Sequence, residues 1–371
     1  MIQGAMRSTL PFLATLAASL VLSIPTGLLG CGGDGGSGSS VNTGVPDILT
    51  TEEPKAGFQF LETTYTVPGT NAERTIRLNV WYATEDLEGT TARFNLISQD
   101  PNSLLDASVS VPRGRAPLMI YSHGDRAWGG SNNALARQFV RNGWIVVAPD
   151  HTGNTFFDNT VPRPFEFDVV RAYDLQATLD FMANLPSDHP LAGHVETSRV
   201  LIAGHSYGGH TAWIAGGPEL DLAAIEAGCA PNCVQSELDA YAMYEPDSRV
   251  VGVVALDGGI GATRVADAGF ASMIAPMLFM TPTDDAADQA LFTRSAGADV
   301  TWVQLAGACH ESFTGTLSCP TLELSTSLPI TATYAIAFGI RHVLQSNDAA
   351  LLDILDGTTE VDPVVTFDHH D

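Results

Sequence analysis

The chain has 371 residues, of which 45% are apolar and 16% are charged, so it is long enough to bury a large core. Lysine and arginine number 17 against 42 aspartate and glutamate residues, and the formal net charge of -25 argues against any nucleic-acid partner. Lys55 is the single lysine, which excludes a Walker A lysine, a Schiff-base lysine or a Ser-Lys dyad in the body of the chain.

Residues 1–30 have the pattern of an export signal. Arg7 is their only charge, and an apolar run over residues 10–29 ends in small residues before Cys31. A transmembrane helix is the competing interpretation, although the prolines and hydroxyl residues in this run make a poor span. Leu28-Leu29-Gly30-Cys31 resembles a bacterial lipobox, which implies that Cys31 is acylated and becomes the mature N-terminus.

The segment 31–55 is expected to be a flexible tether, because its glycine and serine residues cannot bury apolar surface. Gly32 follows the lipobox where an aspartate would retain a lipoprotein at the inner membrane. By resemblance to Gram-negative lipoproteins, we therefore expect an exported protein that is anchored to the outer membrane through Cys31, on its periplasmic or cell-surface side.

The remainder, 56–371, is predicted to form one catalytic domain. Strands at 58–67 and 75–82, joined by a turn at 68–71, predict a hairpin, and short apolar runs then alternate with helical patterns. Further strands are expected at 118–121, 145–148, 200–203, 250–256, 277–280 and 300–305, and helices at 132–141, 167–185, 286–295 and 330–344. This alternation predicts an α/β fold with a mostly parallel sheet covered by helices on both faces.

The segment 216–249 is too long for a simple crossover and is predicted to form a small cap over the site. An exported chain retains disulfides. The cysteine nearest in sequence to Cys229 is Cys233, and the one nearest to Cys319 is Cys309. We therefore expect these two local bridges. Zinc coordination by the four thiolates is disfavoured, because the spacings between the cysteines differ from those of the paired cysteine ligands in zinc knuckles. No metal site is predicted.

The strongest chemical signal is Gly-His-Ser-Tyr-Gly at residues 204–208, placed between the strand 200–203 and the helical run 211–215. A strand-to-helix turn of this kind exposes the serine hydroxyl, so Ser206 is the predicted nucleophile. His310 follows the last strand before the closing helix and is the predicted base. His151, at a strand end, is the alternative base.

Other histidines are expected to play lesser parts. His123 and His205 are predicted to pack or to form hydrogen bonds, and His369 and His370 are predicted to be solvated in a polar tail. The backbone N–H groups of Tyr207 and Asp125 are the predicted oxyanion-hole donors. An acidic side chain beside a developing anion is unusual, so the Asp125 carboxylate is expected to turn away or to bind Arg126.

With these residues in view, the chain resembles the α/β-hydrolase superfamily, and within it the group of platelet-activating-factor acetylhydrolases, chlorophyllases and bacterial cutinase-like enzymes. The resemblance covers roughly residues 58–345 and rests on five motifs in order. They are Ser122-His123-Gly124, the run 148–153, Arg163-Pro164 before Asp168, the Ser206 turn, and the run 309–313.

The resemblance implies an acid that orients His310, and two candidates remain open. Asp257 comes directly after the strand 250–256 and matches the acid of the acetylhydrolases and chlorophyllases. Asp285 follows the next strand and matches the acid of cutinase-like members. Asp257 is favoured because the following Gly-Gly makes a tight turn, and Asp284 is a third choice.

The sequence thus predicts a monomeric serine carboxylic-ester hydrolase that needs no cofactor, with a lipid, short-chain ester or polyester substrate. The alternatives are a peptidase or amidase on the same triad and a catalytically silent binding lipoprotein.

Overall fold

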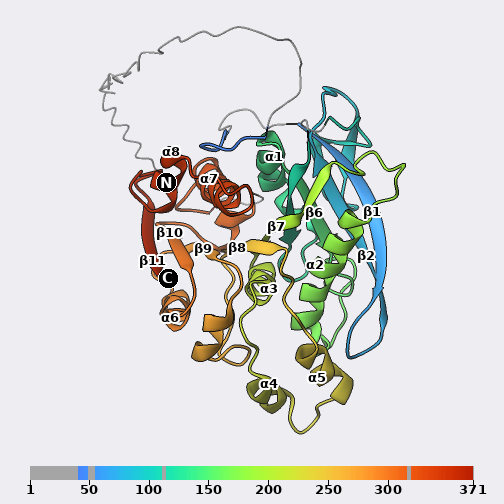
Figure 1. Cartoon of the computed structure of the whole chain (residues 1–371), viewed down its shortest axis with the longest axis vertical. Helices are drawn as coiled ribbons and strands as arrows, with labels where there is room; N and C mark the ends of the chain where they lie inside the picture. The colour runs from blue at the N-terminus through green and yellow to red at the C-terminus, as the bar shows by residue number, and fades with distance from the viewer. Residues whose placement is uncertain (1–40, 49–54, 111–113, 316–318, 371) are drawn as a thin grey trace, which may run out of the picture. The chain divides into compact units, whose positions relative to one another are not determined.

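The central element of the fold is an eleven-stranded sheet with the order β11-β10-β9-β8-β7-β5-β6-β2-β1-β4-β3 (Figure 1). The computed structural model describes residues 41–48, 55–110, 114–315 and 319–370. The strands are β1 (Ala56–Thr66), β2 (Glu73–Tyr82), β3 (Thr90–Arg93), β4 (Gln99–Leu105), β5 (Ala116–Ser122), β6 (Ile145–Asp150), β7 (Val195–His205), β8 (Val250–Leu256), β9 (Met277–Pro282), β10 (Val300–Leu305) and β11 (Val365–His370).

The middle of the sheet is parallel. Strands β6, β5, β7, β8, β9 and β10 all run the same way, with β2 antiparallel to β6 at one side and β11 antiparallel to β10 at the other. The predicted α/β architecture is therefore confirmed. In such a sheet the carboxyl ends of the parallel strands share one edge, which brings residues that are distant in sequence together.

Helices cover both faces of the sheet. Alternate residues of the parallel strands point to opposite sides and build two separate cores. Figure 1 shows α1, α7 and α8 on one side and α2, α3 and α6 on the other. The helices are α1 (Asn133–Arg141), α2 (Phe167–Ala183), α3 (Tyr207–Ala215), α4 (Leu222–Cys229), α5 (Gln235–Ala242), α6 (Ala286–Arg294), α7 (Leu324–His342) and α8 (Ala349–Leu355), with 3-10 turns η1 (Gly129–Asn132), η2 (Asp267–Ser272) and η3 (His310–Phe313).

The predicted hairpin of β1 and β2 is present and pairs over its whole length. Strands β3 and β4 were not predicted, because Pro101 interrupts the pattern of β4. Both His369 and His370 belong to β11 rather than to a polar tail. His369 is exposed, as expected, but the expectation that His370 is solvated is wrong because its side chain is partly buried. The His370 ring lies between carbonyl groups of Phe292 and Ala298 and stacks on the Phe292 ring.

The segment 216–249 contains α4 and α5, and the cap expected there stays a prediction. Ile225 and Tyr241 bury their apolar surface against Val169 of α2 and Val67 after β1, which forms a small separate core. No residue of this segment lines the pocket that contains Ser206. Burial of these apolar side chains against α2 is the physical reason for the placement. The predicted bridge between Cys229 and Cys233 is present at the end of α4.

The predictions for the export signal, Cys31 and most of the tether fall outside the described residues. Within the described part of the chain, no helix is both long enough and apolar enough to cross a membrane.

Candidate active site

Ser206 occupies a sharp turn between the end of β7 and the start of α3. Its backbone has φ +57°, in the region that favours glycine, and the flanking glycines make this turn feasible. A Cβ at Gly204 would collide with the carbonyl of Gly208, and one at Gly208 would collide with the carbonyl of Ser122. The glycines of the motif are therefore required by close backbone approaches, and the turn presents the serine at the carboxyl edge of the sheet.

His310 begins η3, after β10, and its ring points to the end of β8. Its Nδ1–H donates a hydrogen bond to Oδ2 of Asp257, with 2.5 Å between the two atoms. This hydrogen bond to a carboxylate raises the pKa of His310 above its usual value, because it stabilises the charged imidazolium. His310 is also a lining residue of the pocket that contains Ser206.

The two candidate acids have different environments. Asp257 binds His310, whereas Asp285 is the N-cap of α6 and accepts a hydrogen bond from the backbone N–H of Ala287 at 2.7 Å. A short polar side chain at that position satisfies an otherwise unpaired donor of the helix. The structure therefore brings Asp257 and His310 together and leaves Asp285 in a capping role.

A third carboxyl group lies near this pair. Burial, together with the negative charges of Asp257 and Asp285, raises the pKa of Asp288 to about 7. Asp288 is the third residue of α6 and was not singled out from the sequence. With a pKa near 7, Asp288 is only partly ionised at neutral pH, which reduces the negative charge beside Asp257.

His205, the residue before Ser206, supports the segment that carries His310. Its Nε2–H donates to the backbone carbonyl of His310 at 2.8 Å, and the two ring centroids are 4.5 Å apart. Burial and the nearby His310 lower the pKa of His205 to about 4, so the ring is neutral near pH 7. The hydrogen-bonding part predicted for His205 is thereby borne out.

Ser206 and His310 line the same hollow, which has a volume of about 380 Å³. The loop after β5 supplies much of the remaining wall, including Gly124, Asp125 and Trp128. A Cβ on Gly124 would lie only 3.3 Å from the Cβ of Ser206, so this loop passes directly beside the serine. A strand end, a loop and η3 thus converge on one small open pocket.

The Asp125 carboxylate takes part in contacts away from the serine. It accepts hydrogen bonds from Nδ2 of Asn154 at 2.7 Å and from Nε of Arg126 at 3.1 Å, and it pairs with Arg163. Burial by itself raises the pKa of Asp125, but the Asn154 amide and the charges of Arg163 and Arg126 outweigh it and lower this pKa. The expected contact with Arg126 is present, and the contacts with Asn154 and Arg163 were not foreseen.

His151 and His123 are fully buried. His151 donates from Nδ1 to Asp174 at 2.7 Å and contacts Ser122 through Nε2, and both its side chain and that of Asp174 are fully buried. Burial and the charge of Arg171 lower the pKa of His151 to about 3. His151 does not line the pocket, so the structure does not favour it as a base.

The second predicted bridge, between Cys309 and Cys319, is also present. Cys309 precedes His310, and the hydroxyl of Ser312 in η3 donates a hydrogen bond to the Cys319 sulfur at 3.0 Å. The bridge therefore closes a loop at the residue next to His310.

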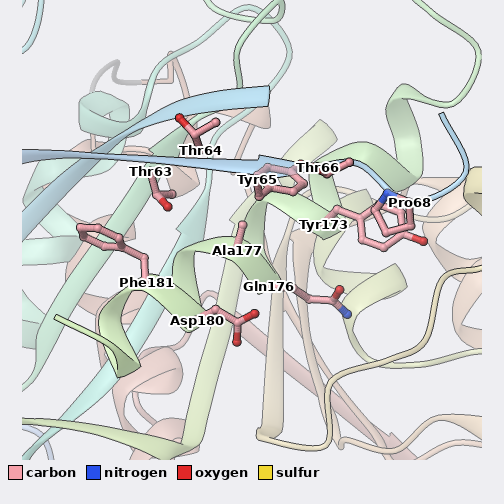
Figure 2. Close-up of a pocket in the computed structure, with 10 residues that line it drawn as sticks. All are labelled: Thr63, Thr64, Tyr65, Thr66, Pro68, Tyr173, Gln176, Ala177, Asp180 and Phe181. Carbon is pink, nitrogen blue, oxygen red and sulfur yellow. The ribbon is translucent and has the colours of Figure 1, made fainter. Parts of the chain in front are cut away.

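Another hollow, of about 420 Å³, lies between β1 and α2 (Figure 2). Figure 2 shows Thr63 of β1 on the side of α2, whereas Thr64 points away from that helix, and Gln176 and Asp180 come from α2. Its described lining contains no histidine, serine or cysteine. The pocket with Ser206 is smaller, but it combines a strained serine with a histidine–carboxylate pair, so we regard it as the candidate active site.

Comparison with solved structures supports the fold. A ferulic acid esterase from Streptomyces cinnamoneus is similar, with a TM-score of 0.61 at 19% sequence identity, over 88% of this chain and 99% of that chain. No family model and no curated protein matches the chain. The resemblance is therefore one of architecture, and the subgroup named from sequence motifs remains a prediction.

The pairing of His310 with Asp257 makes a prediction about titration. Replacing Asp257 with Asn removes the carboxylate that stabilises the imidazolium, so the pKa of His310 should fall. Asp285→Asn should leave that pKa almost unchanged, since Asp285 caps α6. NMR titration of the His310 ring in the three proteins measures this, and a larger shift in Asp285→Asn would contradict the assignment.

Proposed function

We propose that this protein is a serine carboxylic-ester hydrolase that works through an acyl-enzyme on Ser206, with His310 as base and Asp257 as the orienting acid. The observation that carries the proposal is the His310–Asp257 pair, which faces the same pocket as a serine held in a left-handed turn. A carboxylate bound to Nδ1 fixes the tautomer whose Nε2 can accept a proton.

The reaction begins when Oγ of Ser206 attacks the ester carbonyl carbon and His310 Nε2 accepts the hydroxyl proton. The carbonyl oxygen becomes an anion that the N–H groups of Tyr207 and Asp125 stabilise. The tetrahedral species collapses when the alcohol leaves with the proton from His310. Water, deprotonated by the same ring, then attacks the acyl-enzyme and releases the carboxylic acid and free Ser206.

The substrate is an ester whose acyl part fits an open pocket of about 380 Å³. Lipid, short-chain ester and polyester substrates all remain within the proposal, and the name of the structural neighbour adds esters of ferulic acid to the panel. Hydrolysis should be measured with nitrophenyl esters of increasing chain length, with a feruloyl ester and with a nitroanilide. The comparison of the esters with the nitroanilide distinguishes ester from amide hydrolysis.

Ser206→Ala should abolish ester hydrolysis down to the small rate that pocket binding alone supplies, because the proposed acyl-enzyme forms on Oγ of Ser206. A fluorophosphonate probe should label the wild type and not this variant. Ser198→Ala is the matched control, because Ser198 is an exposed residue within β7. Labelling that persists in Ser206→Ala would refute the assignment.

The Cys309–Cys319 bridge should influence both rate and stability. Its loss in the paired Cys309→Ser and Cys319→Ser protein should lower the free energy of unfolding by about 2 to 3 kcal/mol, by the chain-entropy estimate for so short a loop. Turnover should also fall, because displacing a base by about 1 Å can cost about a hundredfold in rate.

The Cys229→Ser and Cys233→Ser pair is the control for that experiment, since this bridge lies outside the described pocket lining. Thermal unfolding and ester hydrolysis well below the melting temperature should be measured for both. If turnover is unchanged in the Cys309 and Cys319 protein, the bridge only stabilises the fold.

We also propose that the protein is exported and anchored to the outer membrane by acyl chains on Cys31. The proposal rests on the lipobox-like sequence that ends at Cys31 and on the glycine-serine segment that follows it. Attached acyl chains supply most of the membrane affinity of such a protein. Cys31→Ser should therefore move the protein from the membrane fraction to the soluble fraction, and a wild type that is wholly soluble with an unmodified N-terminus would contradict the proposal.

A further inference from the structure

Five side chains form a closed ring that joins the two residues proposed as oxyanion-hole donors. We propose that this ring positions the two backbone N–H groups, with Arg163 and Asp125 as positioning residues. The ring runs through Asp125, Asn154, Arg171, Tyr207 and Arg163. This inference rests on the proposed function, because it concerns the oxyanion hole of that reaction.

The outer half of the ring connects Asp125 to Tyr207 through Arg163. The Arg163 guanidinium pairs with Oδ1 of Asp125 and also lies over the Tyr207 ring, 4.6 Å from its centroid. Arg163 comes from the loop between β6 and α2, far in sequence from both partners. A planar guanidinium suits these two contacts at once, because it can pair with a carboxylate and stack on an aromatic face.

The inner half of the ring connects the same two residues through the interior. The Asn154 amide donates to Oδ1 of Asp125 at 2.7 Å, and its own oxygen accepts a hydrogen bond from Nη1 of Arg171 at 2.6 Å. The Arg171 guanidinium lies 4.5 Å from the centroid of the Tyr207 ring. Tyr207 therefore has cationic groups from both Arg163 and Arg171 against its ring.

Arg171 also holds the peptide that leads into the Asp125 loop. Its Nη2 donates to the backbone carbonyl of His123 and to Oγ of Ser122. The Arg171 side chain is fully buried, and burial lowers its pKa to about 10, so it stays charged at neutral pH. A buried charge with this many partners costs much free energy to displace, which makes it a rigid support.

The hydroxyl of Tyr207 is fixed as well. It donates to Oδ1 of Asp168 at 2.6 Å, and Asp168 is itself paired with Arg264 at 2.6 Å. The Tyr207 side chain is thus held at the ring and at the hydroxyl, next to the backbone N–H that would face the oxyanion. The same contacts explain how an acidic residue can sit at the hole, because the Asp125 carboxylate is neutralised within the ring.

Such a ring matters for the rate because oxyanion donors act only when they lie about 3 Å from the developing anion. Loss of one member should loosen both donors, since the ring joins them. The hydrogen bonds from the two N–H groups are stronger to the oxyanion of the transition state than to the carbonyl oxygen of the bound substrate. Loosening the donors should therefore lower kcat and change KM little.

The test uses Arg163→Gln, because this side chain is 40% exposed and its replacement leaves the buried groups in place. With the nitrophenyl ester that the wild type hydrolyses best, kcat should fall by about 10- to 100-fold and KM should change by less than about twofold. Arg163→Lys should recover part of the rate, because it keeps the charge beside Asp125 but not the planar stack. Asp125→Asn should resemble Arg163→Gln.

A second readout separates positioning from a general loss of structure. A trifluoromethyl ketone with the same acyl chain as the ester forms a tetrahedral adduct on Ser206, with its oxyanion in the hole. Its inhibition constant should rise by the same factor by which kcat/KM falls, after correction for the active fraction titrated with a fluorophosphonate. Arg249→Gln is the matched control, because Arg249 is similarly exposed and pairs with Asp180 and Asp247 away from the pocket.

The outcomes are distinct. If the wild type hydrolyses esters and Arg163→Gln does so equally well, or loses activity without a matching change in ketone inhibition, the ring does not position the donors and the proposed function stands. If the wild type hydrolyses no ester and its Ser206 is not labelled, both proposals are overturned.

Discussion

The site depends on a backbone constraint at the ends of two neighbouring strands, β7 and β8. Ser206 and Asp257 both have positive φ, at +57° and +44°, although neither is glycine. A residue held in such a conformation costs on the order of 1–3 kcal/mol, and the surrounding hydrogen bonds must supply that free energy. The N–H of Ser206 donates to the carbonyl of Leu256 at 2.9 Å, and that of Asp257 donates to Met280 at 2.7 Å. The sheet itself therefore aims both side chains.

Several of the few cationic side chains in this acidic protein have specific partners. Arg171 is buried against the Tyr207 ring, Arg163 lies over the same ring, and Arg74 pairs with the buried Asp174. Arg74 binds Asp174 through two of its fixed guanidinium donors, and Arg163 and Arg171 place planar guanidinium groups over an aromatic ring. In a sequence with a single lysine, these cationic contacts are made by arginine.

The sequence was informative where local pattern determines geometry. The Ser206 turn could be predicted because glycines at 204 and 208 are a local steric requirement, and His310 because it follows a strand of a parallel sheet. Asp257 and Asp285 could not be separated by strand order, since both follow strands that end at the same edge. The start of α6 right after Asp285 is a capping signal that favours Asp257.

The ring of side chains that includes Asp125 could not be predicted from the sequence, because Arg171 and Asn154 come into contact only through tertiary packing. The one local signal was an arginine in an otherwise apolar stretch of α2. β11 was missed for a related reason, since a polar strand near the chain end becomes ordered only by pairing with β10.

The most direct test of the central claim is a crystal structure of the protein after reaction with a short alkyl fluorophosphonate. The account predicts a bond from phosphorus to Oγ of Ser206, a phosphoryl oxygen within hydrogen-bonding distance of the N–H groups of Tyr207 and Asp125, and His310 still bound to Asp257. A phosphonate on another residue, or a phosphoryl oxygen that faces solvent away from both N–H groups, would contradict it.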